Sequence, residues 1–167
     1  DIKYLSRDNV EEYAWTTSWG VSTRMIGAIV MAHGDDKGLR MPPRIAPIQV
    51  VAVPIYKNDD ERGPVMETAT RLVAALRDAG YRVHLDDRED SPGFKFNDWE
   101  MRGVPVRLEV GPKDVQKGSA VLARRDIPGR DGKQFVDQDA IPAAMGDLLD
   151  AIHSNMLQSA AVFRDAN

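Results

Sequence analysis

A strand, a helix and a second strand follow one another within residues 48–85, and this succession limits the fold more than any other sequence feature. The apolar run 48–55 is typical of a buried strand, and residues 64–79 place their apolar side chains on one side of a helix. Gly80 ends the helix, because glycine accepts the left-handed conformation, and a strand follows at 81–85. Such a unit is a right-handed crossover with parallel strands. The sequence therefore predicts an α/β domain.

The segments after residue 85 extend the same architecture. Pro92 and Gly103 bracket a predicted helix at 94–102, and an alternating strand follows at 104–110. Beyond the Gly111-Pro112 turn and a short polar segment, a strand is expected at 119–125, and residues 133–136 could pair with it across a turn at 127–132. A long amphipathic helix completes the chain over 141–164, with six residues facing inward: Met145, Leu148, Leu149, Ile152, Met156 and Leu157. The prediction is a mixed sheet of about five strands flanked by helices.

The first 46 residues have a different pattern. Two β-like runs, 2–5 and 11–17, predict a hairpin that packs on the rest of the chain or belongs to a larger sheet. A helix follows and ends at Gly34, with five residues on its apolar side: Met25, Ile26, Ile29, Val30 and His33. The proline-rich segment 35–47 has the composition of a linker. We therefore expect two units, a strand-strand-helix piece with its linker at 1–46 and the α/β domain at 47–167.

Composition excludes several classes of function. The net charge of −4 argues against a protein that coats nucleic acid without specificity, although it leaves base recognition open. The absence of cysteine and the three scattered histidines argue against a metal site. No apolar run approaches the roughly 20 residues that span a bilayer, and the start of the chain lacks signal-peptide features. We expect no membrane association and a cytoplasmic location.

The residues from Ser91 to Asp114 combine aromatic, charged and turn-forming residues at a density that suggests a recognition surface. Phe94, Phe96 and Trp99 could stack on unpaired bases, although their spacing prevents all three from facing one way on a helix. At least one of the three rings is therefore expected to be buried. Lys95 suits either a phosphate contact or a solvated position.

Polar residues elsewhere have alternative interpretations. Arg24 follows a strand and begins a helix, where its guanidinium can stack on a purine or be solvated in a first turn capped by Ser22 or Thr23. The segment 86–88 ends a strand at an edge where ligands bind in open α/β sheets, but an internal salt bridge is the favoured interpretation. His33 is expected to be a hydrogen-bonded core residue.

Residues 15–54, WTTSWGVSTRMIGAIVMAHGDDKGLRMPPRIAPIQVVAVP, closely resemble class II prolyl-tRNA synthetases of the archaeal and eukaryotic-like type. The resemblance continues through LDDR, SPGFKFNDWEMRGVPVRLEVGPKD and the final helix. It implies that residues 1–46 are a remnant of the antiparallel aminoacylation sheet and that residues 47–167 form the anticodon-binding domain. It also implies that this chain is a fragment without catalytic residues, which does not catalyse the reaction alone.

The resemblance implies roles for several residues. The family's counterparts of Glu100, Arg107, Lys113 and Asp114 are associated with the two guanines that proline anticodons share. Carboxylates can accept from guanine N1–H and N2–H₂, while Arg or Lys covers O6 or a phosphate. Alternatively, Glu100 and Arg107 form an exposed ion pair worth less than about 1 kcal/mol, and Lys113 and Asp114 are turn residues.

The resemblance also implies cofactors and partners. The family's serine and arginine matched by Ser22 and Arg24 contact ATP. The implied parent enzyme activates L-proline with ATP and Mg²⁺, transfers it to proline tRNA and forms a homodimer, whereas the fragment alone binds no metal or cofactor. The alternative is a stand-alone tRNA-binding or protein-interaction module without catalysis.

Overall fold

The computed structural model describes residues 2–166 and places the five predicted strands of the α/β domain in one mixed sheet, in the order β4-β3-β5-β6-β7. These strands are β3 (Val50–Pro54), β4 (Val83–Leu85), β5 (Val106–Val110), β6 (Ser119–Arg124) and β7 (Lys133–Asp137). The helices are α1 (Arg24–His33), α2 (Asp59–Asp78), α3 (Pro92–Met101), α4 (Pro112–Lys117) and α5 (Ile141–Ala166), with a 3-10 turn, η1 (Gln138–Ala140), before α5. The predicted fold class is confirmed.

The crossover predicted from residues 48–85 is present. β3 pairs in parallel with β4 on one side and with β5 on the other, so β3 lies inside the sheet. This position explains its continuous apolar sequence, because both faces of β3 are covered and every residue in it is buried. β6 and β7 are antiparallel, as the turn at 127–132 predicted, and β5 and β6 are also antiparallel.

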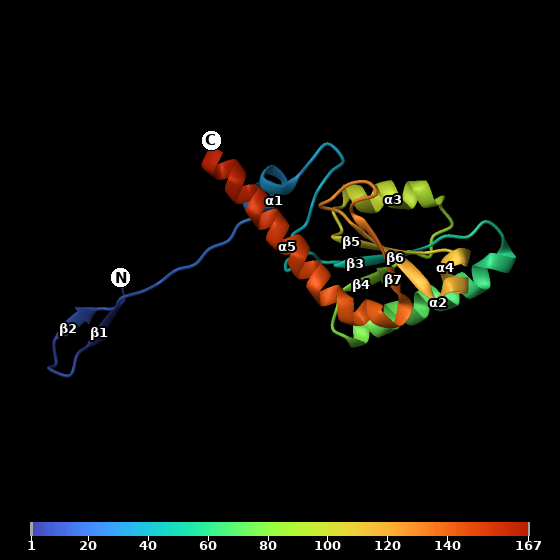
Figure 1. Cartoon of the computed structure of the whole chain (residues 1–167). Coiled ribbons are helices and arrows are strands. Elements are labelled where there is room, and N and C mark those ends of the chain that lie inside the picture. Colours follow the sequence, from blue (N-terminus) through green and yellow to red (C-terminus); the bar gives the residue numbers. More distant parts are fainter. Residues whose placement is uncertain (1, 167) are drawn as a thin grey trace.

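Helices cover both faces of the sheet (Figure 1). α2 and α5 pack on one face over the larger core, which includes Leu72, Leu108 and Met145. α3 covers part of the other face, where Trp99 packs on Val51. Because α3 is short, it leaves space beside β5, β6 and β7, and the candidate site lies there.

The start of α2 and the helix α4 are the main departures from the predicted helices. α2 begins at Asp59, five residues before Pro64, because the Asn58 side chain accepts a hydrogen bond from Glu61 N–H at 2.9 Å and caps the helix. The polar segment after β5 is the short helix α4, which Pro112 begins and Gly118 ends in the left-handed conformation at φ 66°.

The apolar sides of α5 and α1 are only partly buried. Five of the six predicted inward residues of α5 are buried, but Leu157 is 65% exposed, so that assignment was wrong. In α1, Ile29 and His33 are half-buried, whereas Met25, Ile26 and Val30 are exposed. The C-terminal part of α5 passes beside α1, and residues of both helices line one pocket (Figure 1).

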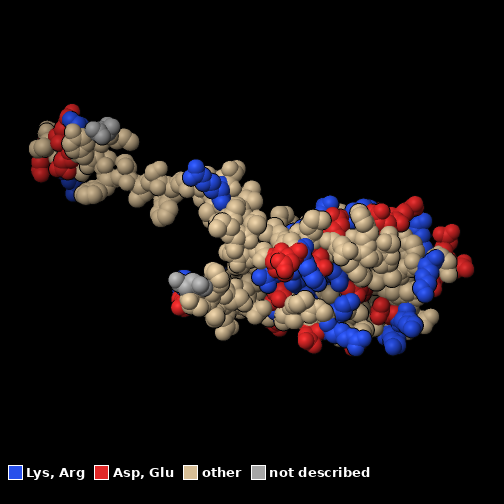
Figure 2. All heavy atoms as spheres, turned by 90° about the horizontal axis from the view of Figure 1, so that it is seen from above, with Lys and Arg blue, Asp and Glu red and all other residues tan. Residues whose placement is uncertain are grey.

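The predicted hairpin, β1 (Lys3–Leu5) and β2 (Glu11–Tyr13), stands apart from the α/β domain (Figure 1). Its second strand is shorter than the predicted run 11–17, and Trp15 and Trp19 are 102% and 92% exposed. Figure 2 shows charges of both signs over the domain and few on the stretch that leads to the hairpin. Because the hairpin stands apart from the domain, the alternative that it packs on the rest of the chain was wrong.

The proline-rich segment after α1 is bound to the domain along much of its length. Leu39 N–H donates to Met101 C=O and Met41 N–H donates to Gly103 C=O, each at 3.0 Å. Further along, the Arg82 guanidinium donates to the Ala46 carbonyl at 2.8 Å. The segment therefore forms part of the domain surface, while a domain boundary at residue 46 stays a prediction. In the part of the chain that the structure describes, no helix is long and apolar enough to cross a membrane.

Candidate nucleic-acid interface

Glu100 and Arg107 line one pocket of about 460 Å³ between α3 and strands β5–β7, called here the α3–β5 pocket. Glu100 lies in the last turn of α3, and Arg107 is the second residue of β5. Phe96, one helical turn before Glu100, forms part of the wall, and Gly129 and Arg130 in the β6–β7 turn reach the rim. The fold thus brings together two of the four residues associated with guanine.

Cations predominate in this pocket, where Glu100 is the one carboxylate among the described lining residues; the cations are Lys37, Arg107, Arg124, Arg125, Arg130 and Lys133. Most of them have carboxylate partners around the pocket. Arg107 and Lys133 both pair with Glu109, each at 2.9 Å. Within residues 2–166, Arg130 has no carboxylate within ion-pair distance, which leaves it available to a phosphate.

Glu100 and Arg107 do not pair with each other, so the ion-pair alternative was wrong. Glu100 Oε1 lies 3.3 Å from Lys37 Nζ. The Arg107 guanidinium donates to Glu109 Oε1 and lies over the Phe96 ring, 4.0 Å from its centroid. The Arg107 guanidinium is therefore held between the Glu109 carboxylate and an aromatic wall, at a place where it can support a base.

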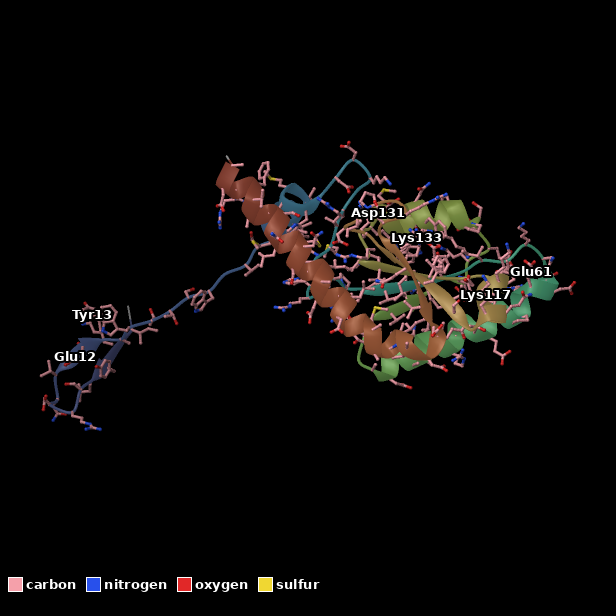
Figure 3. All side chains as sticks on the ribbon, in the orientation of Figure 1. Glu12, Tyr13, Glu61, Lys117, Asp131 and Lys133 are labelled. Carbon is pink, nitrogen blue, oxygen red and sulfur yellow. The ribbon has the colours of Figure 1, made fainter. Side chains whose placement is uncertain are left out.

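Lys113 and Asp114 lie in the first turn of α4, beyond the other end of β5. Lys113 is exposed, and Asp114 Oδ2 accepts the Gly111 N–H at 2.9 Å, which caps the helix. They are helical residues, so their assignment to a turn was wrong. In Figure 3, Lys133 lies beside α3 and Lys117 of α4 lies toward the other end of the sheet. The four predicted residues therefore form two groups, separated by the length of β5.

Lys95 is 2% exposed, so the solvated alternative was wrong. Its Nζ donates to the Asp86 carbonyl at 3.2 Å and lies 4.0 Å from Asp86 Oδ1. It also lines a separate pocket of about 360 Å³ with Arg62 and Ser91. The Lys95 ammonium is thus directed to the buried Asp86 and away from solvent. Its role as a tRNA contact stays a prediction.

Asp86 is the centre of a buried polar cluster beneath α3. It is 0% exposed and accepts hydrogen bonds from Arg88 Nη2 at 2.8 Å and from Trp99 Nε1 at 2.7 Å. The internal salt bridge predicted for residues 86–88 is confirmed. The cluster fixes Trp99 and hence the α3 helix, which carries Phe96 and Glu100 into the α3–β5 pocket.

The three aromatic residues differ in exposure as their spacing predicted. Trp99 is 4% exposed, Phe96 is half-buried and Phe94 is 55% exposed. Phe96 is the ring that reaches the α3–β5 pocket.

Ser22 and Arg24 are exposed and lie at the start of α1. The Ser22 hydroxyl accepts the Arg24 N–H at 3.4 Å, and Thr23, the N-cap residue, makes no side-chain capping bond. A role for Ser22 and Arg24 in ATP binding stays a prediction. His33, at the other end of the helix, is half-buried rather than a core residue, and burial lowers its pKa, with Arg40 and His153 acting in the same direction.

Sequence reasoning missed much of the pocket lining. Lys37 was assigned to a linker, and Arg125, Arg130 and Lys133 were assigned only to a strand end, a turn and a strand start. Their contribution depends on residues from four separate segments meeting at one place. The density of arginine and lysine from 124 to 133 was the available signal.

Acid is expected to destabilise the domain progressively between pH 4 and pH 2. Burial raises the pKa of Asp86, but hydrogen bonds from Arg88 and Trp99 outweigh burial and bring it from 3.8 to about 2. The hydrogen bond from Arg125 lowers the pKa of Asp35 to about 2 as well. A folded-state pKa below the unfolded value contributes stability above the unfolded pKa, and this stability is lost as pH falls through the folded pKa. Urea unfolding midpoints measured at pH 4, 3 and 2 should fall, and equal midpoints would contradict this assignment.

Together, the mixed α/β sheet and a cation-rich pocket with an aromatic wall define a domain of the nucleic-acid-binding class. The family model described as "Anticodon binding domain" matches residues 49–143, and the chain belongs to this family.

Similar proteins extend the comparison to both sides of the matched region. The chain is 53% identical to a proline–tRNA ligase of Roseiflexus castenholzii over 100% of its own length and 35% of that protein. It is 47% identical to the chloroplastic/mitochondrial proline–tRNA ligase of Arabidopsis thaliana, over 99% of this chain and 31% of that one. A crystal structure of prolyl-tRNA synthetase from Cryptosporidium parvum, complexed with L-proline and AMP, has 34% sequence identity and a TM-score of 0.87, covering 98% of this chain and 35% of that chain. The chain thus spans about a third of the relatives it matches, and it resembles prolyl-tRNA synthetases as its sequence predicted.

Proposed function

We propose that this chain reads the anticodon of proline tRNA as part of a proline–tRNA ligase. The observation that carries the proposal is the meeting of Glu100 and Arg107 in one cation-rich pocket on an anticodon-binding fold. In the proposed site, Glu100 accepts from the N1–H and N2–H₂ groups of one guanine, and Arg107 supports the plane of a base. Arg130 contacts a phosphate at the rim.

The second guanine is assigned to Lys113 and Asp114 on α4. Their separation from the α3–β5 pocket along β5 supports two recognition points for two bases, instead of one pocket that holds both. Asp114 has a second carboxylate oxygen beyond the one that caps α4, and this oxygen can accept from guanine. Lys113 is exposed and can reach O6 or a phosphate. Lys95 takes at most a supporting part, because it is directed to Asp86.

The remaining proposals concern the parent enzyme. It activates L-proline with ATP and Mg²⁺ and transfers the proline to tRNA as a cytoplasmic homodimer. The relative solved with L-proline and AMP supports the substrates. In this chain, Ser22 and Arg24 at the start of α1 are the residues assigned to ATP, and residues 1–46 are assigned to the aminoacylation domain. Within residues 2–166, no three His, Asp or Glu side chains gather closely enough to hold a metal ion, so no step is assigned to Mg²⁺ here.

An RNA stem-loop with the proline anticodon is expected to bind the chain more tightly than the same stem-loop with both guanines replaced by adenines. Each wrong base should cost about 1–3 kcal/mol, as in other specific sites, so the double replacement should weaken binding at least tenfold. Fluorescence anisotropy at a fixed salt concentration measures both dissociation constants. A stem-loop with two exchanged stem base pairs is the control and should bind like the original. Equal affinity for all three RNAs would contradict the proposal.

A further inference from the structure

The segment that joins α1 to the domain reaches the α3–β5 pocket. Asp35 forms two hydrogen bonds with Arg125, from Nη1 at 2.8 Å and from Nη2 at 2.6 Å. The Arg125 side chain is 5% exposed, and its Nε donates to the main-chain carbonyl of Glu100 at 2.9 Å. Asp35 therefore connects the end of α1, through one buried guanidinium, to the residue assigned to guanine.

The next residues of the segment are held by the Asp35 side chain and by the backbone of the α3 C-terminus. The Lys37 N–H donates to Asp35 Oδ1 at 3.0 Å, and the Leu39 N–H donates to the Met101 carbonyl. Between them, Gly38 has φ 125°, and a Cβ at this position would lie 2.6 Å from the Met101 Cα. Only glycine fits this close approach. Lys37 is thus fixed on both sides, and its side chain lines the pocket.

The Lys37 ammonium and the Glu100 carboxylate lie side by side, with Nζ 3.3 Å from Oε1. An ammonium has three N–H donors, so this contact leaves donors available. The Watson–Crick edge of guanine presents the complementary arrangement, an O6 acceptor next to the N1–H and N2–H₂ donors. Arg107 is less suited to O6, because its Nε and Nη2 both contact Glu109 and its guanidinium carbon lies 4.0 Å from the centroid of the Phe96 ring.

We propose that Lys37 donates a hydrogen bond to O6 of the guanine whose N1–H and N2–H₂ groups are accepted by Glu100. This inference rests on the proposed function and identifies a further specificity-determining residue for it. Lys37 lies outside the matched family region 49–143 and before the predicted boundary at residue 46. The guanine site is therefore built from two segments of the chain, and residues 47–167 alone contain only part of it.

Base analogues that lack one or two groups of the Watson–Crick edge of guanine test the assignment on the whole chain. Inosine lacks the N2 amino group but keeps O6, whereas 2-aminopurine lacks O6 and the N1 proton but keeps the amino group. Stem-loops carrying guanine, inosine or 2-aminopurine, placed at each of the two anticodon guanine positions in turn, are titrated with the wild-type chain and with Lys37→Met. At one position, Lys37→Met should lose about tenfold of the wild-type preference for guanine over 2-aminopurine, the size of one charge-assisted hydrogen bond. Its preference for guanine over inosine should stay unchanged.

Two further variants make the result decisive. Lys37→Arg keeps a donor at this place and should restore most of the preference for guanine over 2-aminopurine. Lys117→Met removes the same charge from exposed α4, away from the pocket, and should leave both preferences at wild-type values. An undiminished preference for guanine over 2-aminopurine in Lys37→Met, with wild-type circular dichroism, would overturn the role of Lys37 alone. A wild-type chain without preference among the three bases would overturn the proposed function, and this inference with it.

Discussion

Replacing Asp86 with alanine is expected to lower the free energy of unfolding by about 3–5 kcal/mol, the cost of removing one partner from a buried ion pair. The fully buried carboxylate accepts hydrogen bonds from Arg88 and Trp99, and buried Lys95 lies beside it. Without Asp86, the Lys95 ammonium and the Trp99 N–H stay in a region of low dielectric without their acceptor. Urea denaturation at pH 7, followed by circular dichroism, measures the difference.

Asp87→Ala is the matched control, because Asp87 is the adjacent aspartate and is exposed. It should change the free energy of unfolding by less than about 0.5 kcal/mol, as exposed positions usually do. If Asp86→Ala unfolds within about 1 kcal/mol of the wild type, the cluster does not fix α3 in the manner inferred here.

Replacing Glu100 with glutamine is expected to reduce the preference for guanine over inosine by about tenfold to a hundredfold. The substitution keeps the shape of the side chain but removes its charge and one acceptor oxygen, and hydrogen bonds to charged groups contribute about 1.5–3 kcal/mol. Inosine differs from guanine only in the missing N2 amino group, so the ratio of the two dissociation constants isolates this contact. Stem-loop titrations at constant salt concentration provide both values.

Glu67→Gln makes the same chemical change at an exposed position on α2, which packs on the opposite face of the sheet from α3. It should keep the wild-type preference for guanine over inosine, because net charge alone does not distinguish these two bases. If Glu100→Gln keeps that preference too, Glu100 does not accept from the N2 amino group.

The sequence predicted the sheet well because its signals are local and agree with one another. The apolar run in β3 requires a strand with both faces covered, and Gly80 and Gly103 end their helices with φ 90° and 75°. The start of α2 was predicted wrongly because two sequence signals compete there. At α2, the proline at position 64 suggested a helix start, but the Asn58 cap and the acidic first turn begin the helix earlier. α4 was missed because six residues are too few to show a helical period.

The candidate site was predicted less completely, because its parts meet only through the tertiary fold. The resemblance identified Glu100 and Arg107, and α3 and β5 bring both to one pocket. Nothing local to Lys37 indicates that it lies beside Glu100, which is 63 positions away in sequence. The composition of 35–47 suggested a linker, since proline removes backbone donors and disfavours the helical conformation in the residue before it. Here Gly38 instead permits a close approach of two backbones.

The bond between Asp35 and Arg125 also constrains how this sequence can diverge. Its two residues are 90 positions apart, and the Arg125 side chain is only 5% exposed, so loss of the aspartate alone leaves a largely buried charge without its carboxylate partner. A lineage can change either residue at low cost only when the other changes with it. Paired substitution at 35 and 125 is therefore the pattern that homologous sequences should record. The connecting segment and the anticodon-binding domain are in this sense inherited as one unit, although only the domain has the pattern of an independent fold.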